Sequence, residues 1–218
     1  MNALSAEENG RLAEFKACVI GCGGLGGYVI EHLARLGLGH ITAVDGDVFE
    51  ESNLNRQLFS DETVIGKNKA EQAKARIGIV NSDVCVTAVN EFLTEENCGQ
   101  ILKGHDIIID ALDNVAARRL IEKEAGKQKI PLVHGAIAGW YGQVCVIMPG
   151  DSVFDKIYQG SAEKGLESEL GNLPFTAAAA AAIEAATAVK VLLGKRDGLS
   201  GKFLTFDLLN NEFEIFEL

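Results

Sequence analysis

The chain has 218 residues, of which 47% are hydrophobic and 23% are charged, a composition that excludes disordered and collagen-like proteins. Its 20 basic and 31 acidic residues give a net charge of −11, so it lacks the positive charge that nucleic acids and anionic membrane surfaces attract. We therefore expect neither as a partner. A chain of this length can bury a large core without disulfides or metals, and we expect residues 1–218 to form a single domain.

Cysteine usage and the absence of targeting signals indicate a cytoplasmic protein. The five cysteines are widely spaced and form no CxxC pair, so the sequence predicts neither a zinc site nor a disulfide framework. Residues 1–12 carry acidic groups and no apolar core, which excludes a signal peptide. The apolar stretch Phe175–Leu193 contains Glu184 and Lys190. We interpret it as a buried helix and not as a membrane span.

Strands and helices alternate in the first two thirds of the chain. An apolar run at 105–111 is typical of the buried centre of a parallel sheet. The alternation predicts a doubly wound, Rossmann-like α/β sheet that is largely parallel in the N-terminal half. The predicted strands are 16–21, 40–45, 83–90, 105–111 and 131–137, and the predicted helices are 28–37, 67–80, 94–104 and 114–128.

The last third of the chain changes character. Residues 141–149 form an apolar run that predicts a strand, antiparallel to its neighbour, and 151–172 are polar and interrupted by glycine, as in a loop. Residues 174–194 predict a helix, with proline at its start and Gly194 past its end. Two short strands around Asn210–Asn211 predict a hairpin. The expected sheet is therefore mixed, with antiparallel strands added at its C-terminal end.

A glycine-rich turn follows the first predicted strand. The segment GCGGLG at 21–26 places Gly21, Gly23, Gly24 and Gly26 between that strand and a helix. Such glycines let the backbone approach a phosphate at the N-terminus of a helix. Asp45 ends the second strand, where a carboxylate can accept hydrogen bonds from ribose hydroxyls. The pattern predicts a nucleotide site but does not separate NAD from ATP, and a purely structural turn is the alternative.

Two cationic side chains follow the second strand. Arg56 lies in the segment SNLNRQ at 52–57, and Lys69 lies in the next predicted helix. A triphosphate can use both, because arginine offers a bidentate fork and lysine a point charge. The alternative is solvated surface charge, which we favour for the other basic residues of that helix.

A third polar segment, DALDN at 110–114, ends the strand at 105–111. Ligands of open α/β sheets bind at the carboxyl ends of the strands. A carboxylate beside phosphates can hold Mg²⁺, and we assign that role to Asp113. The alternative is that Asp113 or Asn114 caps the following helix, a role that is compatible with the first.

These motifs together resemble the ThiF/MoeB/HesA branch of the ubiquitin-activating-enzyme-like superfamily. The resemblance runs from about Phe15 to the C-terminus and rests on GCGGLG, VDGD, SNLNRQ, GKNKAE, DALDN and PLVHGAIAGWYGQV. It implies an ATP-dependent adenylyltransferase. Such an enzyme activates the C-terminal glycine carboxylate of a small ubiquitin-like sulfur-carrier protein, in thiamin, molybdopterin or related sulfur pathways, and releases pyrophosphate.

The resemblance also implies roles for individual residues. Gly24 would lie against the phosphates and Asp45 would bind the ribose. Little acid–base chemistry is needed, so we interpret the four histidines as structural. The triphosphate and its Mg²⁺ would be bound by Asn53, Arg56, Gln57, Lys69 and Asp113, with Arg56, Lys69 and Asp113 as the catalytic residues and Asn114 beside them.

The sequence departs from the family pattern in three places. It lacks the two CxxC pairs that hold structural zinc in many members, so we expect no zinc. The crossover segment at 165–172 contains no cysteine for thioester or persulfide chemistry. The N-terminal Arg-x-x-Arg pattern is reduced to Arg11. Two alternatives therefore stay open: a catalytically impaired module that binds a nucleotide or a carrier, and an NAD-dependent oxidoreductase, which would leave Arg56, Lys69 and Asp113 without a task.

The resemblance further predicts a homodimer. The helix at 175–193 is apolar nearly all round, which suits burial on more than one side. The segment Gly135–Tyr141 ends with Trp140 and Tyr141, and these two residue types are common at interface hot spots. The alternative is that both elements pack inside one chain.

Overall fold

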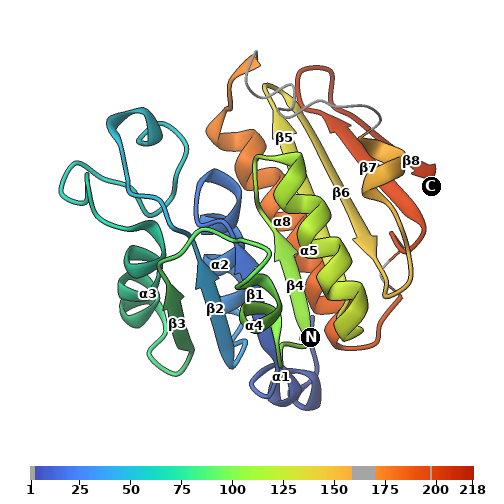
Figure 1. The fold of residues 1–218 in the computed structure, drawn as a ribbon, viewed down its shortest axis with the longest axis horizontal. Helices are drawn as coiled ribbons and strands as arrows, with labels where there is room; N and C mark the ends of the chain where they lie inside the picture. Colours follow the sequence, from blue (N-terminus) through green and yellow to red (C-terminus); the bar gives the residue numbers. More distant parts are fainter. Residues whose placement is uncertain (1–2, 159–169, 197) are drawn as a thin grey trace.

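The protein is described by a computed structural model that covers residues 3–158, 170–196 and 198–218 (Figure 1). Its strands form one eight-stranded sheet in the order β3-β2-β1-β4-β5-β6-β7-β8. Strands β1 to β5 pair in parallel, and β6, β7 and β8 are added antiparallel. The predicted fold class is confirmed. The strands are β1 (Lys16–Ile20), β2 (His40–Val44), β3 (Cys85–Val89), β4 (Ile107–Asp110), β5 (Leu132–Ala138), β6 (Tyr141–Ile147), β7 (Lys202–Asp207) and β8 (Glu212–Glu217).

Helices cover both faces of the sheet. Helices α2, α3 and α8 bury their apolar residues in one core cluster, and α4, α5 and α6 bury theirs in a second. In Figure 1, α2 and α8 lie behind the sheet and α4 and α5 in front of it. The described helices are α1 (Ala6–Leu12), α2 (Gly24–Arg35), the 3₁₀ helix η1 (Glu51–Asn53), α3 (Lys69–Val80), α4 (Cys98–Leu102), α5 (Val115–Gln128), α6 (Phe154–Ile157) and α8 (Pro174–Leu192).

Helix α8 packs inside the chain against α2, β5 and β6. Its 19 residues and a mean hydropathy of 1.5 in its most apolar window would allow it to cross a bilayer by length and composition. However, alanines along it are fully buried, and their small side chains let the helix approach its neighbours closely. Glu184, near its middle, is also fully buried. The prediction of a buried helix is therefore confirmed.

The C-terminal hairpin is also as predicted. Strands β7 and β8 pair antiparallel, and Asn211 in the turn between them has a φ of 58°. Asparagine tolerates this left-handed conformation better than most residues, which explains why the sequence signal at Asn210–Asn211 was informative.

Three local predictions differ from the structure. Helix α2 begins at Gly24 and not near residue 28, because the glycine-rich turn itself forms its first turn, with Gly27 N donating to Gly23 O at 3.0 Å. Helix α1 was not predicted, although Ser5 and Glu8 form a capping box at its start. The segment at 151–172 was predicted as a loop but contains α6, which is held by the fully buried Phe154.

Residues 159–169 lie outside the described residues. They include most of the crossover segment at 165–172, so the structure does not test the interpretation of that segment.

Candidate nucleotide site

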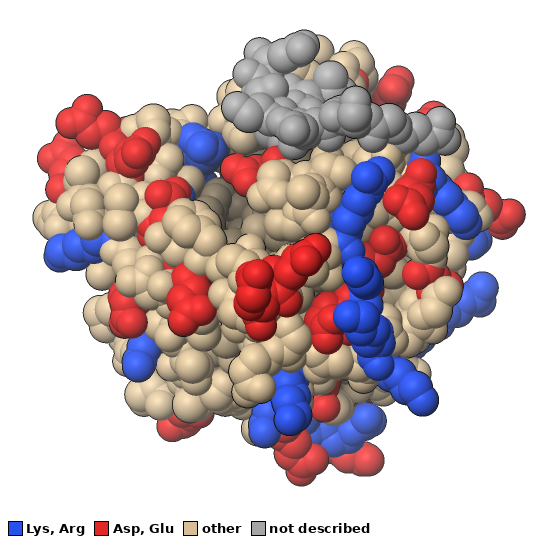
Figure 2. Space-filling view, in the orientation of Figure 1, with Lys and Arg blue, Asp and Glu red and all other residues tan. Residues whose placement is uncertain are grey.

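A pocket of about 260 Å³ opens at the carboxyl ends of the parallel strands. Its lining includes Gly23 and Gly24 after β1 and Asp113 and Asn114 after β4. Since β2 and β4 lie on opposite sides of β1, the strand order reverses here, and this reversal is where open α/β sheets bind their ligands. In Figure 2 the hollow faces the viewer and acidic side chains gather around it.

The four glycines of the glycine-rich turn form two pairs with different structural roles. Gly21 has a φ of 96°, and a Cβ there would lie 2.6 Å from Ala111 O. A Cβ on Gly26 would lie 1.8 Å from Gly21 O. These two glycines therefore allow β1, β4 and α2 to pack closely, and they do not line the pocket. Gly23 and Gly24 line it and leave the N-terminus of α2 open to a ligand.

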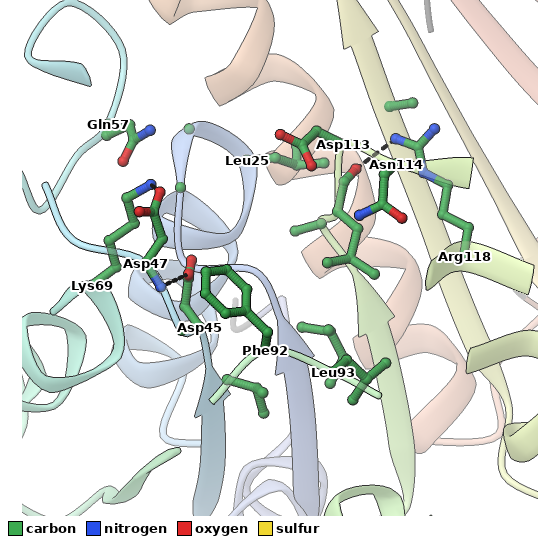
Figure 3. A pocket seen from close by; sticks show the side chains of 18 of the residues that line it. Leu25, Asp45, Asp47, Gln57, Lys69, Phe92, Leu93, Asp113, Asn114 and Arg118 are labelled. Atoms are coloured by element: carbon green, nitrogen blue, oxygen red, sulfur yellow. Dashed lines mark hydrogen bonds and ion pairs between the residues drawn. The ribbon is translucent and has the colours of Figure 1, made fainter. Parts of the chain in front are cut away.

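Asp45, Asp47 and Lys69 form one wall of the pocket (Figure 3). Asp45 accepts hydrogen bonds from Cys22 N at 2.8 Å and from Asp47 N at 2.9 Å. Burial raises the pKa of Asp45, although these two hydrogen bonds oppose the shift. Lys69 is buried and donates from Nζ to Asp47 Oδ2. Burial alone would raise the pKa of Asp47, but the hydrogen bonds from Lys69 and from Val48 N, together with the charge of Lys69, outweigh burial and lower the pKa.

Asp113 and Asn114 lie on the other side of the pocket (Figure 3). The Asn114 side chain accepts from Ala117 N at 2.8 Å and is the N-cap of α5. Within the described part of the chain, the Asp113 carboxylate makes no hydrogen bond or ion pair, which leaves it available to a cation. The capping role thus belongs to Asn114, and the Mg²⁺ role of Asp113 stays a prediction.

Arg56 and Gln57 reach the pocket from the segment after η1. Arg56 Nη1 donates to Ser52 O at 2.8 Å and to Asn55 Oδ1 at 2.9 Å. Gln57 is buried, and its Oε1 has no hydrogen-bond partner among the described residues. Asn53 lies outside the pocket lining. Its Oδ1 accepts from Glu50 N at 3.1 Å, so the structure gives it a local capping role.

Sequence reasoning missed several residues of the lining. Asp47 could have been found, because it lies two positions after Asp45 in the motif VDGD. Phe92 and Leu93 form an apolar side below the polar walls (Figure 3), but they lie in a segment without a recognisable motif. Arg118 and Asn172 also line the pocket and carried no signal in the sequence.

A buried polar network lies behind the pocket. His134 donates from Nδ1 to Asp110 Oδ2 at 2.7 Å, and both side chains are fully buried. Burial lowers the pKa of His134 in spite of this carboxylate. Arg118 donates to Leu112 O at 2.6 Å and to Tyr158 Oη at 2.8 Å. The network fixes the loop that carries Asp113, and His134 lies outside the pocket lining.

The charge of the lining favours a divalent cation beside an anionic ligand. Four carboxylates, Asp45, Asp47, Glu91 and Asp113, face three cationic side chains, Arg56, Lys69 and Arg118. A triphosphate would add negative charge to a site that is already negative. Hard oxygen ligands such as Asp113 suit Mg²⁺. A structural zinc site needs four close Cys or His ligands, and the described residues contain no such group of three or more; the absence of zinc stays a prediction.

Comparison with known proteins assigns the family. A model described as the ThiF family matches residues 1–218. The chain belongs to the ThiF family. The SAMP-activating enzyme E1 of Haloferax volcanii is 34% identical over 220 residues, covering 98% of this chain and 80% of that protein. The sulfur carrier protein adenylyltransferase of Thermus thermophilus is 35% identical over 220 residues, covering 96% and 81%.

Solved structures show that other chains share this fold. A crystal structure of PaaA superposes with a TM-score of 0.81 at 22% identity, covering 97% of this chain and 75% of that one. A crystal structure of Escherichia coli MccB with ATP gives a TM-score of 0.80 at 21% identity, covering 96% of this chain and 65% of that one. The predicted resemblance to the ThiF branch is thus confirmed at the level of family and fold.

Proposed function

We propose that this ThiF-family chain uses MgATP to adenylate the C-terminal glycine carboxylate of a small ubiquitin-like sulfur-carrier protein. The observation that carries the proposal is the pocket at the reversal of strand order, where Gly23 and Gly24 meet Arg56, Lys69 and Asp113. An NAD-dependent oxidoreductase would need the glycines but not these charged side chains. The names of the two relatives from Haloferax volcanii and Thermus thermophilus support the same activity.

The walls of the pocket suggest how ATP lies. The remaining lone pairs of Asp45 suit ribose hydroxyls, and Phe92 and Leu93 offer an apolar surface to adenine. The N-terminus of α2 offers backbone N–H groups to the phosphates. Lys69 lines the pocket beside Asp47, and its ammonium group can donate both to the Asp47 carboxylate and to a phosphate oxygen.

Asp113 is the residue that we assign to Mg²⁺. Its carboxylate lines the pocket and has no other described partner, as expected of a ligand that awaits a cation. Mg²⁺, when bound, would neutralise negative charge on the phosphates. Arg118 would fix the backbone of the Asp113 loop through its hydrogen bond to Leu112 O.

The reaction requires two anions to approach each other. An oxygen of the carrier carboxylate attacks the α-phosphorus of ATP, the bond between that phosphorus and the bridging oxygen breaks, and the electron pair leaves with pyrophosphate. The products are a carboxyl adenylate and pyrophosphate, with no proton transfer. Arg56 and Lys69 would lower the repulsion and stabilise the charge that moves to the leaving group.

Nucleotide binding tests the proposal directly. Isothermal titration calorimetry is expected to give clearly tighter binding of MgATP than of NAD, because only the triphosphate uses Arg56, Lys69 and Asp113. ATP–pyrophosphate exchange is expected to require a candidate carrier protein. Tighter binding of NAD would contradict the proposal. Binding of MgATP without exchange, for every candidate carrier, would favour a catalytically impaired module.

We also propose that the protein is a cytoplasmic homodimer. Trp140 and Tyr141 are 39% and 51% exposed, and the Trp140 ring packs 4.8 Å from that of Phe175 between centroids. These aromatic side chains are suitable anchors for a second copy. All five cysteines are free, which suits a reducing compartment.

Light scattering at micromolar concentration is expected to give the mass of a dimer, and Trp140→Ala is expected to weaken the dimer. A monomer that still exchanges pyrophosphate would show that dimerisation is not required.

A further inference from the structure

Two amide oxygens in the wall of the pocket lack hydrogen-bond partners among the described residues. They are Gln57 Oε1 and Asn172 Oδ1, and both atoms are buried from solvent. Gln57 as a whole residue is only 7% exposed. A buried acceptor without a donor costs free energy, so its presence in a ligand pocket indicates that a ligand supplies the donor.

The fold brings these two amides to the same pocket from distant parts of the chain. Gln57 follows η1, and Asn172 lies just before α8. Asn55 Nδ2 donates to Asn172 O at 3.3 Å and connects the two segments. Asn172 also forms an isolated bridge with Gly139, at the turn between β5 and β6. The position of Asn172 is therefore fixed by the backbone on one side and by Asn55 on the other.

The phosphates of ATP cannot satisfy these two oxygens. Phosphate oxygens are acceptors, and an acceptor does not pair with the oxygen of an amide. The donors of ATP are the ribose hydroxyls and the adenine amino group. In the arrangement proposed above, the ribose hydroxyls donate to Asp45 and the adenine ring lies against Phe92. Neither donor then reaches Gln57 or Asn172. We therefore expect the second substrate to supply the missing donors.

We infer that Gln57 and Asn172 accept hydrogen bonds from backbone N–H groups of the extended C-terminal tail of the carrier. This inference rests on the proposed function and assigns residues to the acyl substrate. A glycine tail exposes its backbone N–H groups without side chains in the way. Gln57 can at the same time donate from Nε2 toward the phosphates, since the amide offers both a donor and an acceptor. It would thus contact both substrates where they react.

N-methylated peptides test the inference. The probe is a synthetic peptide that ends in Gly-Gly with a free carboxylate, compared with two analogues in which one or the other glycine is replaced by N-methylglycine. Each analogue lacks one N–H donor. The readout is the apparent KM of the peptide in ATP–pyrophosphate exchange, together with the Kd of MgATP from calorimetry.

In the native chain, at least one N-methylated analogue is expected to raise the peptide KM by about three- to tenfold, the effect of one hydrogen bond. In Gln57→Leu or Asn172→Leu, N-methylation of the glycine that pairs with the substituted residue is expected to leave the peptide KM unchanged, because the acceptor of that N–H is already absent. Gln100→Leu, which removes an exposed amide on α4 outside the pocket, is the matched control and should keep the full penalty.

The outcomes separate this inference from the proposed function. Equal KM values for all peptides, or the same penalty in the native chain and in both pocket variants, would overturn the inference. Exchange with none of the peptides would also overturn it, because a tail that is recognised through its own N–H groups should be recognised in a peptide. Failure of the native chain to bind MgATP would instead contradict the proposed function.

Discussion

Asp113→Ala is expected to reduce ATP–pyrophosphate exchange by about 100-fold or more, the size of loss that follows removal of one charge-stabilising group from an active site. The physical reason is the charge of the pocket. Its acidic side chains outnumber its basic ones, so a triphosphate needs a divalent cation, and Asp113 is the carboxylate that remains available to hold it. Exchange should be measured with saturating carrier over a range of Mg²⁺ concentrations.

The fold should survive this substitution. Asp113 lies in the loop between β4 and α5, and the N-cap of α5 is Asn114, so the thermal unfolding midpoint should change little. The matched control is Asp83→Ala, which removes an exposed aspartate before β3, at the opposite end of the parallel strands. It should leave exchange unchanged. Near-native exchange in Asp113→Ala would show that Mg²⁺ is held by another carboxylate of the pocket.

The fold could be predicted because its signals are local. The apolar runs of β1, β2 and β4, the glycines at 21–26 and the hairpin at Asn210–Asn211 each specify one element. The βαβ alternation then limits how those elements join. Boundaries were less certain where two signals overlap. Helix α2 began early because the glycines of the turn are also the first residues of the helix.

The site was predictable where its residues follow a strand or belong to a recognisable motif. Asp45 and Asp113 follow strands, Arg56, Gln57 and Lys69 lie in the motifs SNLNRQ and GKNKAE, and all five line the pocket. Arg118 and Asn172 reach the same pocket from the first turns of α5 and from the segment before α8. They reach the pocket only because the tertiary fold brings those segments near β1. The spacing of residues along the sequence does not predict that proximity. In the sequence, Arg118 is also indistinguishable from a solvent-exposed helix arginine, whereas in the structure it is buried.

Glu184 illustrates the same limit, because the sequence identified it only as a charge that argued against a membrane span. In the structure its carboxyl group is fully buried on α8, and neither oxygen has a hydrogen-bond partner among the described residues. It lies against β5, where a Cβ on Gly135 would come within 2.4 Å of Glu184 Cδ. Burial raises the pKa of Glu184 well above its ordinary value, Asp110 adds to the shift, and Arg118 opposes it.

We therefore expect Glu184→Gln to stabilise the protein, increasingly so as the pH rises. The folded-state pKa of Glu184 is above its unfolded value, so its contribution to stability is fully present below the unfolded pKa. It is lost as the pH rises toward the folded pKa, at about 1.4 kcal/mol per pH unit. Glutamine has nearly the same shape and does not ionise. The free energy of unfolding, measured by urea denaturation between pH 5 and pH 8, should thus fall less steeply with pH in the variant.

Glu31→Gln is the matched control, because Glu31 is a second buried glutamate with the opposite environment. Burial would raise the pKa of Glu31, but hydrogen bonds from Arg76 and Arg35 outweigh it and lower the pKa. Its contribution to stability is therefore present above the unfolded pKa and lost as the pH falls through the folded pKa. Glu31→Gln should destabilise the protein at pH 7, whereas Glu184→Gln should stabilise it. If both substitutions destabilise the protein to the same extent at pH 8, Glu184 is ionised in the folded state and has a partner that its surroundings do not suggest.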